Sequence, residues 1–129
     1  MTTSVLIVDD DTDVRQALSE LLQDEGYRVE GAADGRDALA KLRQGLRPAL
    51  ILLDLMMPGM NGWDFRQAQL EDPELRELPV VVVTASGRNP DDIRTQLGPV
   101  EVVAKPIQPT DLLELVERLA RPEPLRQTA

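Results

Sequence analysis

Two residue types that often build reactive sites are missing from this chain. Its 129 residues include no cysteine and no histidine. Without cysteine, neither a disulfide framework nor a thiolate metal site can form, and without histidine, imidazole catalysis and histidine-ligated metal are excluded. Acid–base chemistry, if there is any, must therefore rely on carboxylates and lysine.

Basic clusters and long apolar segments are missing as well. The formal net charge is −9, and Lys and Arg form no cluster of the kind that a broad nucleic-acid-binding surface needs. The first four residues contain no basic segment, and no apolar run approaches the roughly 20 residues that span a bilayer. We therefore expect a soluble, cytoplasmic protein with no membrane insertion and no direct nucleic-acid binding.

Short apolar runs are present, and four of them stop at a polar residue. These runs are Val5–Val8 before Asp9, Leu50–Leu53 before Asp54, Val80–Val83 before Thr84, and Val102–Ala104 before Lys105. Continuous apolar runs of this length are typical of parallel strands that are covered on both faces. A fifth strand is predicted at Tyr27–Ala32, where apolar and polar residues alternate as they do in an edge strand.

Helical patterns alternate with these strands. They follow Asp11 as far as Gly26, run from about Gly35 to Gly45, and cover Trp63–Leu70, Arg88–Leu97 and Pro109 to Leu119. Five βα units predict a doubly wound α/β domain with a parallel sheet in the order 2-1-3-4-5 and the Ala49–Asp54 strand at its centre. We expect one domain over residues 1–121 and a short polar tail over 122–129, because this length leaves no room for a second domain.

The polar residues at the strand ends predict one shared site. In sheets of this kind, ligands bind outside the carboxyl ends of the strands where the strand order reverses, and Asp9, Asp10 and Asp54 end the two strands that flank this point. Three crowded carboxylates repel one another and so favour a bound cation. With oxygen ligands alone and phosphate to handle, Mg²⁺ is the natural ion.

These groups also suit phosphoryl transfer. A carboxylate can act as a nucleophile and form an aspartyl phosphate, and Lys105 and Thr84 supply the positive and hydrogen-bonding groups that the developing charge needs. Each residue has an ordinary explanation by itself: Asp11 as a helix cap, Asp54 as a turn residue, Lys105 as a surface lysine. Their coincidence at strand ends that meet favours the joint functional interpretation. A cis Lys105-Pro106 bond would turn Lys105 into the crevice.

The same residues resemble the receiver domain of two-component response regulators, over nearly the whole chain from Val5 to about Leu119. The resemblance is carried by Val8-Asp9-Asp10-Asp11, by the residues from Leu53 to Gly62, by Thr84-Ala85 and by Lys105-Pro106. It implies a flavodoxin-like (βα)5 fold and a stand-alone receiver whose Asp54 accepts a phosphoryl group from a histidine kinase, a histidine phosphotransfer protein or a small phosphodonor.

The resemblance also implies a role for each site residue. Asp10 would bind Mg²⁺ directly, Asp9 would act mostly through water, and the backbone carbonyl of Met56 would complete the protein ligands. Lys105 would pair with the phosphoryl group, Thr84 would move to donate a hydrogen bond to it, and the Lys105-Pro106 bond would be cis.

Three features depart from the family pattern in the part that transmits the signal. Val102 stands where receivers usually have Tyr or Phe, and valine has no ring to swing and no hydroxyl to expose. Ile107 replaces the frequent Phe after Lys-Pro, and the segment from Ser86 to Leu97 is short and contains Pro90. We therefore expect an unusual or weak output through the fourth helix and the fifth strand.

Two other functions are compatible with parts of this pattern. A protein-interaction module with a vestigial site would explain Val102, although all five family positions are intact. A phosphohydrolase of the haloacid-dehalogenase kind would share the fold type and the nucleophile. Such enzymes carry a second Asp two residues after the first as general acid, and Met56 occupies that position here, which argues against turnover of external phosphoesters. Among receivers, the sequence leaves open whether the chain regulates a target directly or passes phosphate along a relay.

Overall fold

Strands and helices alternate along the chain in the computed structural model, which describes residues 3–84, 89–98 and 100–120. The elements are β1 (Ser4–Val8), α1 (Thr12–Asp24), β2 (Arg28–Ala32), α2 (Gly35–Arg43), β3 (Leu50–Asp54), α3 (Gly62–Glu71), β4 (Val80–Thr84), α4 (Pro90–Leu97), β5 (Glu101–Ala104) and α5 (Pro109–Leu119). Every predicted element is confirmed, and each strand begins within about one residue of its predicted start. The proposed tail at 122–129 and residues 86–88 of the short segment before α4 lie outside the described residues.

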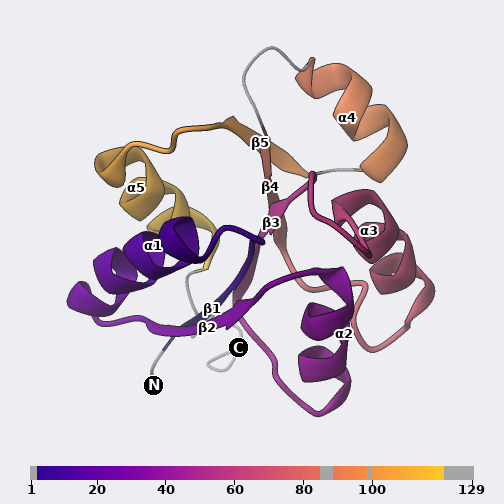
Figure 1. Ribbon diagram of the computed structural model, residues 1–129, viewed down its shortest axis with the longest axis horizontal. Coiled ribbons are helices and arrows are strands. Elements are labelled where there is room, and N and C mark those ends of the chain that lie inside the picture. Colours follow the sequence, from indigo (N-terminus) through magenta and orange to yellow (C-terminus); the bar gives the residue numbers. More distant parts are fainter. Residues whose placement is uncertain (1–2, 85–88, 99, 121–129) are drawn as a thin grey trace, which may run out of the picture.

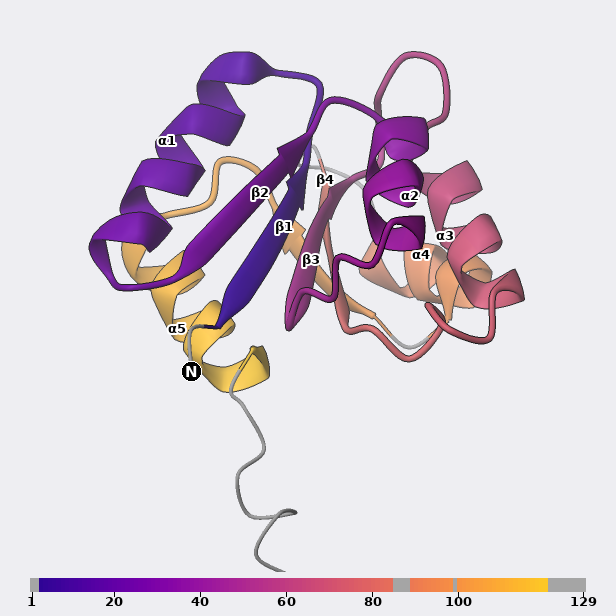
Figure 2. The same cartoon turned by 90° about the horizontal axis from the view of Figure 1, so that it is seen from below.

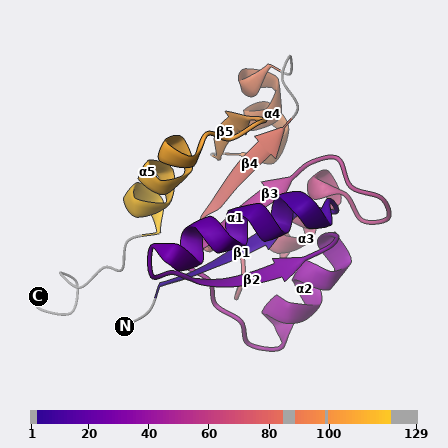
Figure 3. The same cartoon turned by 60° about the vertical axis from the view of Figure 1, so that its left-hand side comes forward.

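The strands form a parallel sheet in the predicted order, β2-β1-β3-β4-β5. Figure 3 shows β2 and β5 at the two opposite edges and β3 in the middle. β3 is buried along its whole length, whereas β2 is partly exposed, as an edge strand with one wet face should be. The reversal of strand order falls between β1 and β3, so the ends of these two strands border the same crevice.

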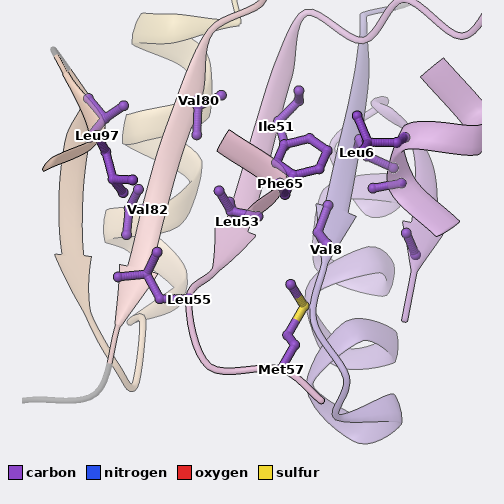
Figure 4. Packing of buried hydrophobic residues seen from close by; sticks show 14 of the residues in the cluster. Leu6, Val8, Ile51, Leu53, Leu55, Met57, Phe65, Val80, Val82 and Leu97 are labelled. Atoms are coloured by element: carbon purple, nitrogen blue, oxygen red, sulfur yellow. The ribbon is translucent and has the colours of Figure 1, made fainter. Parts of the chain in front are cut away.

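Helices cover both faces of the sheet and give the domain three layers. α1 and α5 lie on one face, and α2, α3 and α4 lie on the other (Figures 1 and 2). Side chains of each buried strand alternate between the faces, so Leu6 and Val8 enter one core while Val5 and Ile7 enter the other. Figure 4 shows the first core, where Phe65 of α3 packs among the apolar side chains of β1, β3 and β4.

Local signals place the helix starts. The Asp11 carboxylate accepts hydrogen bonds from the backbone N–H groups of Asp13 and Val14, which confirms its predicted role as the cap of α1. Pro90 and Pro109 stand in the first turns of α4 and α5, where a missing N–H costs nothing. Within the described ranges, no helix is both long and apolar enough to cross a membrane.

Candidate functional site

Three carboxylates meet at the carboxyl ends of β1 and β3. One oxygen from each of Asp9, Asp10 and Asp54 lies within 4.8 Å of the others. Asp9 and Asp54 are buried, with 4% and 5% of their surfaces exposed, and Asp10 is exposed. The predicted cluster is therefore assembled, with one carboxylate facing solvent and two set into the end of the sheet.

Lys105 reaches across the crevice from the end of β5 and bridges the two buried carboxylates. Its Nζ lies 3.2 Å from Asp9 Oδ2 and 3.3 Å from Asp54 Oδ2. The backbone N–H of Lys105 donates to the Thr84 carbonyl (2.7 Å), and the Lys105-Pro106 bond is cis, as expected. The ammonium group is thus held over the cluster by its carboxylate partners and by the adjoining strand.

The buried carboxylates and the ammonium group perturb one another's protonation. Burial raises the pKa of Asp54, and the nearby Asp9 carboxylate raises it further, while Lys105 only partly offsets both effects. Burial by itself would lower the pKa of Lys105, but attraction to Asp54 and Asp9 outweighs it, so the pKa of Lys105 is raised. Without a metal, the site holds more negative charge than one lysine neutralises.

Thr84 and Met56 also lie at this end of the sheet. The Thr84 side chain is buried, and its Oγ1 has no hydrogen-bond partner among the described residues. A buried hydroxyl without a partner is costly, and sites that bind ligands are where such groups are found. The Met56 backbone N–H donates to Asp54 Oδ1 (3.3 Å), so this residue borders the cluster.

Arg15 contacts the acidic turn, a contact that the sequence reasoning missed. Its NH1 donates to the backbone carbonyl of Asp9 at 2.6 Å. An arginine in the first turn of a surface helix ordinarily projects into solvent, and nothing in the local sequence indicates that this one folds back over the end of β1. The signal lies in β2, where Gly31 leaves space beside the Arg15 side chain.

Gly62 allows α3 to start directly against the end of β3. A Cβ at this position would lie 2.6 Å from the Asp54 carbonyl oxygen and 2.7 Å from Leu55 Cα, both of them backbone atoms that cannot move aside. The Gly62 N–H donates to the Leu55 carbonyl (3.0 Å), which closes the loop that follows Asp54. The turn-rich sequence predicted a loop here, and the close backbone contact explains why it needs glycine.

The two residues that depart from the family pattern lie in β5 and just after it. Val102 of β5 pairs with Val82 of β4 and packs, half-buried, against the first core. Ile107 packs against the second core and lines an apolar cavity of about 250 Å³ that extends to Asp54 and Lys105. The crevice is therefore bordered by apolar space on the side of α1 and α5.

The donor set fits a hard divalent cation. Carboxylate oxygens are the ligands that Mg²⁺ prefers, and the exposed Asp10 leaves solvent access for the waters that this ion retains. Burial and the Asp9 carboxylate raise the pKa of Asp54, and a cation bound beside them would favour its ionised form.

Comparison with known proteins assigns the arrangement to one family. Residues 5–117 match the response regulator receiver domain. The structure is similar to that of the chemotaxis protein CheY4 of Vibrio cholerae, with a TM-score of 0.83 and 35% identity, and the match covers 92% of this chain and 99% of that one.

Two relatives among characterised proteins are longer than this chain. The response regulator Rre1 of Synechocystis is 38% identical over 118 residues, and the DNA-binding response regulator MtrA of Mycolicibacterium smegmatis is 38% identical over 125 residues. The matches cover 90% and 95% of this chain but 51% and 53% of the relatives. The chain therefore spans about half the length of these two proteins.

Proposed function

This chain belongs to the response regulator receiver domain family, whose members act in two-component signalling, and we propose that its Asp54 accepts a phosphoryl group in a Mg²⁺-dependent reaction. The observation that carries the proposal is the position of Asp54. Its buried carboxylate lies within 4.8 Å of ligand oxygens of Asp9 and Asp10 and 3.3 Å from the Lys105 ammonium.

These contacts support the following transfer step. A carboxylate oxygen of Asp54 attacks phosphorus, a P–O bond to the aspartate forms, and the bond from phosphorus to the donor breaks. The leaving group, an imidazole nitrogen or an acyl oxygen, departs with the electron pair of that bond. Attack requires the ionised carboxylate, so neutralisation of the surrounding negative charge favours the reacting form.

Lys105 and Thr84 serve the product state in this proposal. Lys105 exchanges part of its interaction with Asp54 for a phosphoryl oxygen, and its positive charge stabilises the charge that develops there. The Thr84 hydroxyl, which has no partner among the described residues, donates a hydrogen bond to another phosphoryl oxygen. Both groups interact with the phosphoryl oxygens through charge or hydrogen bonding, and neither forms or breaks a covalent bond.

Asp9, Asp10 and the carbonyl of Met56 would hold the magnesium ion beside Asp54. When bound there, Mg²⁺ would supply positive charge that offsets the negative charge of the carboxylate and phosphoryl oxygens. We propose that Asp10, which is exposed, is a direct ligand, whereas Asp9, whose Oδ1 accepts the Asp11 N–H (2.9 Å), acts mostly through water.

The phosphodonor in this proposal is the phosphohistidine of a histidine kinase or of a histidine phosphotransfer protein, and the response is a change in protein contacts. Val102 has neither a ring to reorient nor a hydroxyl to expose, so the change at β5 and α4 is smaller than an aromatic residue would produce. This smaller change is compatible with two roles: transfer of the phosphoryl group to another protein, or direct regulation of a target.

The test is phosphorylation by a small donor. Wild-type protein is incubated with acetyl phosphate and MgCl₂ and followed by intact-mass spectrometry. We expect one added phosphoryl group that depends on Mg²⁺ and is absent from Asp54→Asn, whereas the control Asp64→Asn, which removes an exposed carboxylate in α3, is phosphorylated like wild type.

A second measurement uses beryllofluoride, which mimics the aspartyl phosphate without a leaving group. Binding should change the fluorescence of Trp63, because this residue follows Gly62, whose backbone packs on the Asp54 carbonyl. If neither acetyl phosphate nor beryllofluoride affects the wild type, the phosphoacceptor function is wrong and the vestigial-site alternative takes its place.

A further inference from the structure

We propose that Arg15 is a positioning residue for the magnesium site. Its guanidinium group anchors the Asp9 carbonyl and thereby orients the peptide that leads to Asp10. This inference rests on the proposed function, because it concerns the same ion, and it adds a residue outside the acidic cluster.

The contact joins the start of α1 to the end of β1. Arg15 NH1 donates to the Asp9 carbonyl oxygen at 2.6 Å, while NH2 lies 3.5 Å from Thr12 Oγ1. The Asp9 N–H donates to the Ala32 carbonyl (3.1 Å), and Asp9 Oδ1 accepts the Asp11 N–H (2.9 Å). Arg15 is the side chain that holds the remaining polar backbone atom of Asp9.

Anchoring this carbonyl constrains Asp10. The Asp9 carbonyl and the Asp10 N–H belong to one planar peptide unit, so fixing the oxygen fixes the rotation of the unit and the direction in which Asp10 leaves it. Asp10 is exposed, and no hydrogen bond to its carboxylate is found in the described part of the chain. The orientation of this expected direct ligand therefore depends on its backbone.

Gly31 provides the path for the Arg15 side chain. A Cβ at this position would lie 3.4 Å from Arg15 Cδ and 3.5 Å from Nε, in ordinary van der Waals contact, so no space is left between them for the further methyl groups of valine. The Gly31 carbonyl accepts a hydrogen bond from Lys41 Nζ at 2.6 Å, which fixes β2 from the side of α2. Gly31 thus leaves the space that the Arg15 contact with Asp9 needs.

Charge and position have opposite effects on metal binding. A cation near the site repels Mg²⁺. Loss of the Arg15 charge by itself should therefore tighten Mg²⁺ binding by about twofold, because solvent screens the repulsion. Loss of an outer partner that orients a metal ligand typically weakens binding by about 10- to 100-fold. Weaker binding after removal of a positive charge is therefore the signature of positioning.

The experiment measures Mg²⁺ affinity in the full chain. Wild type, Arg15→Met and the control Arg36→Met are titrated with MgCl₂ and followed by calorimetry and Trp63 fluorescence. Arg36 is an exposed residue of α2, and no hydrogen bond or ion pair joins it to the acidic cluster among the described residues, so it reports the effect of charge alone. We expect Arg15→Met to bind about 10-fold more weakly, and Arg36→Met to bind as wild type or slightly more tightly.

Gly31→Val tests the same contact with the arginine charge retained. Valine suits a strand, so the metal-free unfolding free energy should not fall, while Mg²⁺ affinity should fall as it does in Arg15→Met. In the double variant the two losses should not add, because both remove one contact. This variant also keeps the test valid if Arg15→Met does not fold.

The outcomes separate the two proposals. If wild type binds Mg²⁺ and beryllofluoride but Arg15→Met matches Arg36→Met, the positioning role is wrong and the phosphoacceptor site stands. Additive losses in the double variant would also overturn it. If wild type binds neither ligand, the proposed function itself fails, and the role of Arg15 fails with it.

Discussion

Asp54 occupies a position where function and stability conflict. Its carboxylate is buried beside Asp9, and both burial and repulsion raise its pKa in spite of the Lys105 ammonium. Because the pKa of Asp54 is raised in the folded state, ionisation of its carboxyl has a cost: it lowers the free energy of unfolding. This cost is complete above the folded pKa and disappears as the pH falls through it, because the folded state then takes up a proton.

Neutralising Asp54 should therefore stabilise the metal-free protein. We expect Asp54→Asn to raise the free energy of unfolding at neutral pH by about 0.5–2 kcal/mol, the range usual for a single stabilising substitution. Urea denaturation in the presence of a chelator measures it. The gain should shrink as the pH falls toward the pKa of Asp54, since the wild-type carboxyl then becomes neutral too.

A control removes the general effect of net charge. Glu77→Gln makes the same charge change at an exposed position and should alter stability by less than about 0.5 kcal/mol. Equal gains in the two variants would mean that net charge, not the site, sets the effect. A loss in Asp54→Asn would mean that the Lys105 ion pair outweighs burial and the repulsion from Asp9.

At the scale of elements, buried polar side chains tie α3 to its neighbours. Arg66 Nε donates to the Leu97 carbonyl at the end of α4 (2.9 Å), and its NH1 donates to Gln69 Oε1 (2.8 Å). Gln69 Nε2 donates to the carbonyls of Leu75 and Leu78 (both 3.0 Å) in the segment before β4. Burial lowers the pKa of Arg66.

Truncating Gln69 should remove its three hydrogen bonds together, those with Arg66, Leu75 and Leu78. Gln69→Ala leaves two carbonyls and one guanidinium N–H without their partner in a buried region, and we expect a loss of about 2–4 kcal/mol in the free energy of unfolding. Chemical denaturation measures it. The matched control is Gln67→Ala on the exposed face of the same helix, which should cost less than about 0.5 kcal/mol. Similar losses in both variants would show that helix propensity, not the buried network, sets the cost.

The whole molecule has two cores that share one sheet. Leu53 of β3 enters the core under α2, α3 and α4, whereas Leu50 of the same strand enters the core under α1 and α5. Both side chains are fully buried. Because every buried strand contributes to both cores, neither layer of helices can separate without exposing the other face of the sheet.

The two cores should therefore unfold together. Leu50→Ala and Leu53→Ala should each lower the free energy of unfolding by about 2–5 kcal/mol and keep a single transition. Far-ultraviolet circular dichroism and Trp63 fluorescence, which report different parts of the fold, should give coincident curves. Leu70→Ala, at a partly exposed position of α3, is the control and should cost less than about 1 kcal/mol. Separate transitions in either core variant would show two independent folding units.

Much of the fold and of the site could be predicted because their signals are local. Continuous apolar runs mark strands that are covered on both faces, and the residues after those runs are those that meet at one edge of a parallel sheet. This was enough to predict the strand order, the Asp11 cap and the meeting of Asp9, Asp10, Asp54 and Lys105. These predictions depend only on the periodicity of apolar residues and on which residues end each apolar run.

The sequence by itself thus determined the architecture and the chemical groups of the site, because burial and strand direction are recorded in short stretches of chain. The tertiary structure decided how those groups are supported and charged. Arg15 reaches the Asp9 carbonyl beside Gly31, Gly62 packs on the Asp54 carbonyl, and Gln69 is buried with Arg66. These features depend on distances between segments far apart in the chain, and so does the raised pKa of Asp54.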